Sequence, residues 1–135
     1  MKRVVDASSV IAYLLGEGSQ PEREAMLGDA HAPTLVDVEA TQTLRGLVRG
    51  SRIDLARAET ARAELGQLRM RRHPDASLLR RAWELRDVCT TYDALYVALA
   101  EALDATLLTR DGRLAAAVGR LVDVDRAEQG PAPAP

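Results

Sequence analysis

The sequence predicts an α/β protein with three layers, in which a central parallel sheet of about five short strands is flanked by helices on both faces. The main observation is that short apolar runs alternate along the chain with segments of helical spacing, and parallel strands require such crossover connections. The length of 135 residues and the hydrophobic share of 47% suit one domain built around a single core.

The first half of the chain is expected to contain two strands and four helices. The predicted strands are Lys2–Asp6 and His31–Leu35. The predicted helices are Ala7–Leu15, Glu22–Leu27, Val38–Val48 and a long segment from Leu55 to about Leu68. Asp37 and Asp54 directly precede the last two helices, where a short carboxylate side chain is a favoured N-cap.

The second half is expected to contain three strands and three helices, after a break at His73 and Pro74. The predicted strands are Val88–Cys89, Thr106–Thr109 and Leu121–Val124. The predicted helices are Leu78–Leu85, Tyr92–Leu103 and Asp111–Val118. The domain is therefore expected to span residues 1–126, and the Pro- and Ala-rich residues 127–135 are expected to form a disordered tail.

Composition argues against several classes of protein. Phe is absent and there are only one Trp and three Tyr, so we do not expect bases to stack on aromatic platforms. Trp83 and Tyr96 are expected in the core or in a dimer interface instead. Cys89 is the only Cys and is expected to be a small buried residue. No signal peptide or membrane span is evident, which favours a cytoplasmic location.

Charge is distributed unevenly along the chain. Between Arg45 and Arg86 there are eleven Arg and five acidic residues, a balance of about +6 that leaves about −8 for the rest of a chain with net charge −2. One interpretation is an acidic functional site beside a basic surface that binds a polyanion. The other is a solvent-exposed helical face with no binding role. Arg69, Arg71 and Arg72 are the candidates for contacts with a nucleic-acid backbone.

Four acidic residues are expected at one edge of the predicted sheet. Asp6 ends the first strand and Asp111 follows Thr106–Thr109, while Glu39 and Asp93 lie in the first turns of the helices after the second and third strands. Ligands of open α/β sheets bind outside the carboxyl ends of the strands. Each acid alone is also explained as a helix cap or a first-turn residue, which the helix dipole favours.

Converging carboxylates repel one another unless a cation lies between them. With no cluster of His or Cys, an all-oxygen site favours Mg²⁺ or Mn²⁺, and such ions serve phosphodiester hydrolysis by activating water. Ser8 or Ser9, just after the first acid, and Thr109 are expected to hold a carboxylate or a metal-bound water. Arg110 is a further candidate for a phosphate contact.

Three segments of the chain carry a family resemblance: VVDASSVIAYL, PTLVDVEATQTL and TTYDALYVALAEALDATLLTRDGRL. Together they resemble the PIN-domain ribonucleases, and most closely the VapC toxins of bacterial toxin-antitoxin pairs, over about residues 3–125. The resemblance implies that Asp6, Glu39, Asp93 and Asp111 form a catalytic, metal-binding acidic quartet, with Ser8 accompanying the first Asp. In the leading mechanism the three Asp residues bind the metal, and Glu39 completes the site or polarises the water. Family members often carry Asn where this chain has Gln42.

The resemblance implies a Mg²⁺- or Mn²⁺-dependent endoribonuclease that inhibits translation by cutting RNA such as tRNA or rRNA. It also implies a homodimer that binds a VapB-like antitoxin in a heterotetramer or a larger assembly. The alternative is a catalytically inactive PIN-like module that binds RNA or protein. A phosphoacceptor receiver domain fits poorly, because it needs a Lys near the last strands and the only Lys is Lys2.

Overall fold

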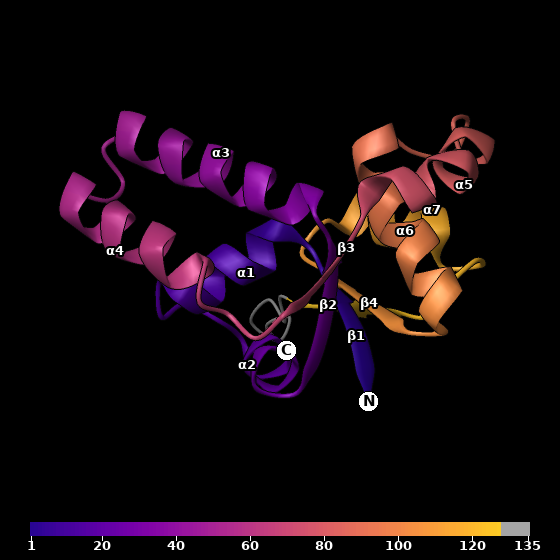
Figure 1. The fold of residues 1–135 in the computed structure, drawn as a ribbon, viewed down its shortest axis with the longest axis horizontal. Helices are drawn as coiled ribbons and strands as arrows, with labels where there is room; N and C mark the ends of the chain where they lie inside the picture. Colours follow the sequence, from indigo (N-terminus) through magenta and orange to yellow (C-terminus); the bar gives the residue numbers. More distant parts are fainter. Residues whose placement is uncertain (128–135) are drawn as a thin grey trace, which may run out of the picture.

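The computed structural model of the protein describes residues 1–127 (Figure 1). Within them, a five-stranded sheet has the order β3-β2-β1-β4-β5, and every pair of neighbouring strands is parallel. The strands are β1 (Lys2–Val5), β2 (Asp29–Pro33), β3 (Arg71–His73), β4 (Thr106–Thr109) and β5 (Val124–Arg126). The predicted α/β fold with a short parallel sheet is confirmed.

Helices cover both faces of the sheet. The helices are α1 (Ala7–Leu14), α2 (Gln20–Leu27), α3 (Leu35–Arg49), α4 (Leu55–Leu65), the 3-10 turn η1 (Asp75–Leu78), α5 (Leu79–Glu84), α6 (Thr91–Leu103) and α7 (Gly112–Val118). Figure 1 shows α1 to α4 on one side of the strands and α5 to α7 on the other. No helix among the described residues is long and apolar enough to cross a membrane.

The core is centred on β1 and β4. Val4 and Val5 pair in register with Leu107 and Leu108, and all four side chains have no exposed surface. Residues 94–100 of α6 are all buried, which makes this helix the most deeply buried one. Strands covered on both faces read as continuous apolar runs, and this is why β4 was predictable.

One predicted strand is wrong, and a different segment takes its place. Val88 and Cys89 lie in turns between α5 and α6, where both N–H groups donate to the Leu85 carbonyl. The edge strand β3 is formed instead by Arg71–His73, which pairs with β2 alone. An edge strand has one side open to solvent and tolerates charged residues, so it carries no apolar signal.

Several element boundaries also differ from the prediction. Helix α3 begins at Leu35, which places Asp37 inside its first turn instead of at the N-cap. The N–H of Leu35 donates to Asp75 Oδ1 at 3.0 Å, so a residue distant in sequence caps this helix. Strand β2 starts and ends earlier than His31–Leu35, α4 ends at Leu65, and β5 begins later than Leu121.

The predicted tail, residues 127–135, lies outside the described residues except for Ala127. Ala127 is fully buried and its N–H donates to the Thr109 carbonyl at 2.9 Å, so the packed chain continues at least to this residue. Tyr96 is buried as expected, but Trp83 is 69% exposed and is not a core residue. The guanidinium of Arg86 lies 5.0 Å from the centre of the Trp83 ring.

Candidate functional site

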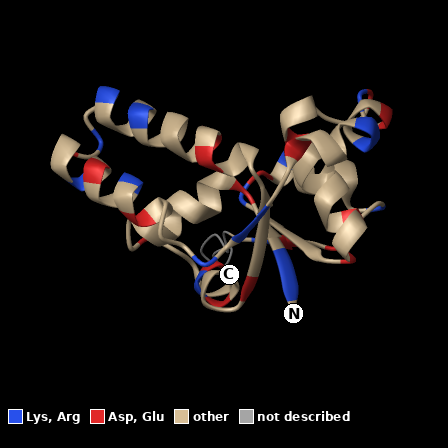
Figure 2. Cartoon of the chain, in the orientation of Figure 1, with Lys and Arg blue, Asp and Glu red and all other residues tan. Residues whose placement is uncertain are grey.

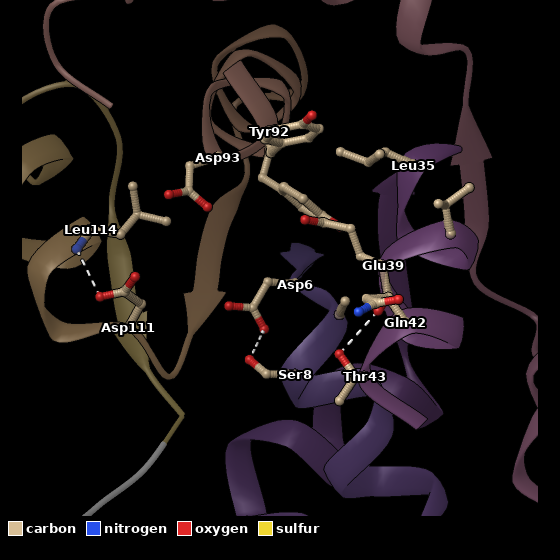
Figure 3. A pocket seen from close by; sticks show the side chains of 13 residues that line it. Asp6, Ser8, Leu35, Glu39, Gln42, Thr43, Tyr92, Asp93, Asp111 and Leu114 are labelled. Carbon is tan, nitrogen blue, oxygen red and sulfur yellow. Dashed lines mark hydrogen bonds between the residues drawn. The ribbon is translucent and has the colours of Figure 1, made fainter. Parts of the chain in front are cut away.

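The four predicted acids line one open cavity of about 480 Å³ at the carboxyl edge of the sheet. Figure 3 shows their carboxylates facing this cavity from four different elements. Asp6 joins β1 to α1, Glu39 lies on α3, Asp93 is in the first turn of α6, and Asp111 is the N-cap of α7. Residues distant in sequence are therefore brought together by the parallel topology.

Asp6 is the most firmly held of the four carboxylates. Its Oδ1 accepts hydrogen bonds from the Ser8 hydroxyl at 2.9 Å and from the Ser9 N–H at 3.0 Å, which makes it the N-cap of α1. Its Oδ2 accepts a 2.6 Å hydrogen bond from Thr109 Oγ1. The same Thr109 oxygen accepts the Asp111 N–H at 3.0 Å. One buried hydroxyl thus connects two of the acids.

Glu39 is held from the opposite side of the cavity. It lies in the second turn of α3, not the first, because the helix starts earlier than predicted. Tyr96, which is 2% exposed, donates a 2.6 Å hydrogen bond to Glu39 Oε1. Burial and this bond to a carboxylate raise the pKa of Tyr96, so the phenol keeps its proton and remains the donor.

The carboxylates act on one another electrostatically. Burial raises the pKa of Glu39, and the charges of Asp93 and Asp6 raise it further, against the effect of the Tyr96 hydrogen bond. Burial likewise raises the pKa of Asp93, and the charges of Asp111 and Asp6 add to this increase. Repulsion of this kind is relieved when a cation enters.

The donor set fits a hard divalent cation. Among the described residues, the cavity lining includes four carboxylates and contains no Lys, Arg or His. Carboxylate oxygens without nitrogen or sulfur donors suit Mg²⁺ or Mn²⁺ better than Zn²⁺. Within residues 1–127, no three acidic, His or Cys side chains are already arranged as a finished ligand set. Mutual repulsion of bare carboxylates favours such a spread arrangement.

The arginines predicted to contact RNA differ in how far their guanidinium groups are bound by other protein groups. Arg72 donates to both oxygens of Asp37 at 2.8 and 3.0 Å and to the Leu65 carbonyl at 2.8 Å, so its guanidinium serves the packing of β3 against α3 and α4. Arg110 donates to both oxygens of the fully buried Glu22. Arg69 and Arg71 are exposed. Figure 2 shows further basic residues along α3 and α4, away from the sheet edge.

Sequence reasoning gave three residues of the cavity no definite role in the site. Tyr96 was expected in the core or in a dimer interface, and no local pattern predicts a hydrogen bond to a residue 57 positions away. Tyr92 is 62% exposed on the rim of the cavity. Gln42 also lines the cavity, one helical turn after Glu39. The spacing of three residues within α3 was the available signal for Gln42.

Comparison with known proteins assigns this chain to a family. A family model described as PIN domain matches residues 3–120. The chain belongs to the PIN domain family. This PIN domain is 41% identical over 111 residues to VapC ribonuclease Mb0985 of Mycobacterium bovis, covering 82% of the chain and 87% of the relative. It is 42% identical over 120 residues to ribonuclease VapC1 of Mycobacterium tuberculosis, covering 86% and 90%.

Solved structures show that the PIN fold is shared beyond these relatives. The crystal structure of PAE2754 from Pyrobaculum aerophilum has a TM-score of 0.66 at 24% identity, covering 92% of this chain and 83% of that one. The structure of VapBC2 from Rickettsia felis, bound to a DNA fragment from its promoter, has a TM-score of 0.63 at 15% identity, covering 93% and 98%. At these identities the likeness concerns the fold.

Proposed function

We propose that this PIN domain is a metal-dependent endoribonuclease that acts as the toxin of a toxin-antitoxin pair. The observation that carries this proposal is the cavity lined by four carboxylates and no basic residue among the described ones. The relatives at about 40% identity are named VapC ribonucleases, which supports RNA as the substrate. A site this acidic binds a phosphodiester only after a cation has neutralised it, so the metal is part of the substrate site.

In this proposal Asp6, Asp93 and Asp111 hold Mg²⁺ or Mn²⁺. When bound, such an ion would supply Lewis-acid chemistry, that is, activation of water and neutralisation of charge on the phosphate. Thr109 keeps Asp6 and Asp111 in a fixed relation through its two hydrogen bonds, and Ser8 orients the other Asp6 oxygen. These contacts limit the rotation of the Asp6 carboxylate before any ligand arrives.

In this proposal Glu39 takes a proton from the attacking water. Its Oε1 accepts the Tyr96 hydrogen bond, and Oε2 is therefore the oxygen that can accept a further proton. Burial and the neighbouring carboxylates raise its pKa, which makes it a better base at neutral pH than an exposed Glu. Hydrolysis by such a site needs no covalent intermediate on the protein.

The names of the relatives and of the solved structures support a biological setting for this proposal. The VapBC2 structure joins a toxin of this fold to its antitoxin, and we propose a VapB-like antitoxin, a homodimeric toxin and a heterotetramer or larger complex for this chain as well. The proposed targets are structured RNAs such as tRNA or rRNA, and the proposed location is the cytoplasm. Arg69 and Arg71, which are exposed, are the better candidates for RNA contacts than Arg72 and Arg110.

The decisive experiment compares the wild type with Asp93→Asn, each with Mn²⁺ and with EDTA, on structured RNA with mapping of the cut ends. The matched control is Asp104→Asn, because Asp104 is exposed, lies outside the cavity and has the left-handed backbone conformation (φ 49°) that Asn tolerates. Cleavage is expected from the wild type and Asp104→Asn, only with metal. Cleavage in EDTA would refute the mechanism, and RNA binding without cleavage would favour a binding module.

A further inference from the structure

The start of helix α3, which carries Glu39, is bound by a segment that lies 40 residues further along the chain. The N–H of Thr34 donates to the His73 carbonyl at 2.8 Å, and the N–H of Leu35 donates to Asp75 Oδ1 at 3.0 Å. Asp75 is the first residue of η1 and comes shortly after the end of β3. Two consecutive N–H groups at the start of α3 are thus tied to the chain that leaves the edge strand.

Asp75 supplies the cap of α3 because the residue in the N-cap position does not. Thr34 has helical backbone angles (φ −57°, ψ −25°), and its side chain makes no capping hydrogen bond. The first N–H groups of a helix have no partner within the helix and need an acceptor from elsewhere. Water could accept from the Leu35 N–H, but water would not fix this helix end relative to η1. The Asp75 carboxylate does both.

The bond from Asp75 holds the face of α3 that lines the acidic cavity. Leu35 and Glu39 are one helical turn apart on the same face, and both line the cavity (Figure 3). Arg72 also binds α3, but its partner Asp37 is absent from the cavity lining. Asp37 lies midway between Leu35 and Glu39 in sequence, which places it on another face of the helix. The Asp75 bond therefore fixes the cavity face of this helix end.

Asp75 is also close enough to the contact between Glu39 and Tyr96 for its charge to act there. Burial is the largest cause of the raised pKa of both Glu39 and Tyr96, and the charge of Asp75 adds to each increase. The hydrogen bond between these two residues is 2.6 Å long and joins α6 to α3. Hydrogen bonds weaken steeply with poor distance or angle, so a small displacement of α3 at its start would weaken this one.

We propose that Asp75 is a positioning residue that fixes the start of α3, so that Glu39 meets Tyr96 and stays directed toward the cavity. The part that Asp75 then has in RNA cleavage rests on the proposed function, whereas the contact of Glu39 with Tyr96 does not. Without the Asp75 carboxylate, the first turn of α3 can unwind, and Glu39 in the second turn is displaced with it. Proton transfer slows as a result, because a displacement of about 1 Å is costly to catalysis.

The first test is a double-mutant cycle on the metal-free protein, with unfolding followed in urea. Tyr96→Phe is expected to lower the equilibrium constant for folding at least about tenfold in the wild type, but only about threefold or less in Asp75→Ala. Asp54→Ala is the matched control. Asp54 caps α4 through the Arg57 N–H at 2.8 Å, and α4 contributes none of the described residues that line the cavity. In Asp54→Ala and in Arg72→Gln, the effect of Tyr96→Phe is expected to keep its full size.

The second test measures RNA cleavage with Mn²⁺ at about pH 7.5, together with Mn²⁺ affinity by calorimetry. Asp75→Ala is expected to lower kcat about tenfold and to leave Mn²⁺ affinity within about twofold of the wild type, because the three Asp residues proposed to hold the metal are unchanged. Asp75→Asn keeps an oxygen acceptor for the Leu35 N–H and is expected to restore kcat to within about twofold. Asp54→Ala is expected to cleave like the wild type.

Each other result has a definite meaning. An effect of Tyr96→Phe that is equal in the wild type and in Asp75→Ala would overturn the inference, and so would the same reduction in Asp54→Ala or Arg72→Gln. Wild-type cleavage by Asp75→Ala, or cleavage by Asp75→Asn as poor as that of Asp75→Ala, would also overturn it. If Asp75→Ala does not fold, Asp75 serves folding and the inference fails. A wild type that cleaves no RNA would refute the proposed function, while the metal-free cycle would still decide whether Asp75 positions Glu39.

Discussion

Replacing Thr109 with Val is the sharpest single perturbation of the site. Val has the shape of Thr but lacks the hydroxyl, and Thr109 has no exposed surface, so water cannot take the place of the lost group. The substitution removes the 2.6 Å hydrogen bond to Asp6 Oδ2 and leaves the Asp111 N–H without the acceptor that it has at 3.0 Å. Asp6 and Asp111 then no longer share a hydrogen-bonding partner.

The expected cost is the sum of two unequal contributions. A hydrogen bond to a charged group contributes about 1.5–3 kcal/mol to stability, and a partly buried N–H left without an acceptor costs about 1 kcal/mol. Thr109→Val is therefore expected to lower the free energy of unfolding by about 2.5–4 kcal/mol. Thr109→Ser keeps the hydroxyl and loses one methyl group, which costs about 1 kcal/mol.

Urea denaturation gives the two stabilities, and Mn²⁺ titration by calorimetry gives the effect on the site. Thr109→Val is expected to weaken Mn²⁺ binding, because Asp6 must then be ordered when the metal arrives, whereas Thr109→Ser is expected to bind like the wild type. Two outcomes would refute this reasoning. One is a loss of stability below about 0.5 kcal/mol for Thr109→Val; the other is equal Mn²⁺ affinity in the two variants.

Three further predictions concern pH, a buried hydrogen bond and an ion pair. Burial and the neighbouring imidazole of His31 lower the pKa of His73 from its usual 6.5, so the unfolded chain binds a proton more readily and stability falls as the pH drops below about 6.5. Urea denaturation at about pH 7.5 and about pH 5.5 is expected to show a smaller pH-dependent loss for His73→Gln than for the wild type. Tyr96→Phe removes the hydrogen bond to Glu39 and is expected to cost about 1.5–3 kcal/mol of stability. It is also expected to shift the acidic limb of the cleavage pH profile to higher pH. Burial raises the pKa of Glu39 and the Tyr96 hydrogen bond lowers it, so the pKa rises further when the bond is lost. Arg72→Gln removes a partly exposed ion pair and is expected to cost about 1–2 kcal/mol in urea denaturation, with RNA affinity in filter binding unchanged.

The controls for these variants use residues of the same type. Tyr13→Phe is the control for Tyr96→Phe, since the Tyr13 hydroxyl makes no hydrogen bond within residues 1–127. Equal effects of the two variants on stability and on the pH profile would contradict the role of the buried bond. Arg69→Gln is the partner of Arg72→Gln, because Arg69 is exposed and lacks an ion pair among the described residues. Equal losses of RNA affinity for both Arg variants would show that Arg72 binds RNA despite its ion pair.

Local sequence signals were sufficient where a helix or a strand depends mainly on its own residues. The apolar run Thr106–Thr109 is buried on both faces and became β4 with the predicted bounds. The acids were predictable because Asp6, Asp93 and Asp111 lie at the start of a helix and Glu39 lies within the first two turns of another, near the carboxyl edge of the sheet. The three family segments contain these same acids. The family motif and the predicted sheet topology therefore indicated the same four residues.

Local sequence patterns failed to predict the secondary structure where a neighbour distant in sequence determines it. Strand β3 consists of Arg71–His73, and only its pairing with β2 makes this polar segment a strand. Val88–Cys89 is apolar enough for a strand but finds no neighbouring strand and turns instead. Asp37 resembles an N-cap in sequence, yet Arg72 from β3 binds it and Asp75 caps the helix. Edge pairing and long-range capping leave no periodic trace in the chain.

The sequence by itself determined the fold class, the family and the four acids, because alternating apolar patterns and strand-end carboxylates are local properties. The tertiary structure decided which partners those acids have. Tyr96 meets Glu39 across 57 residues, Thr109 meets Asp6 across 103, and Arg110 turns away from Asp111 to Glu22 across 88. Such contacts depend on where the packed helices carry each side chain, and their energies, like the pKa values they shift, arise only once burial has excluded water.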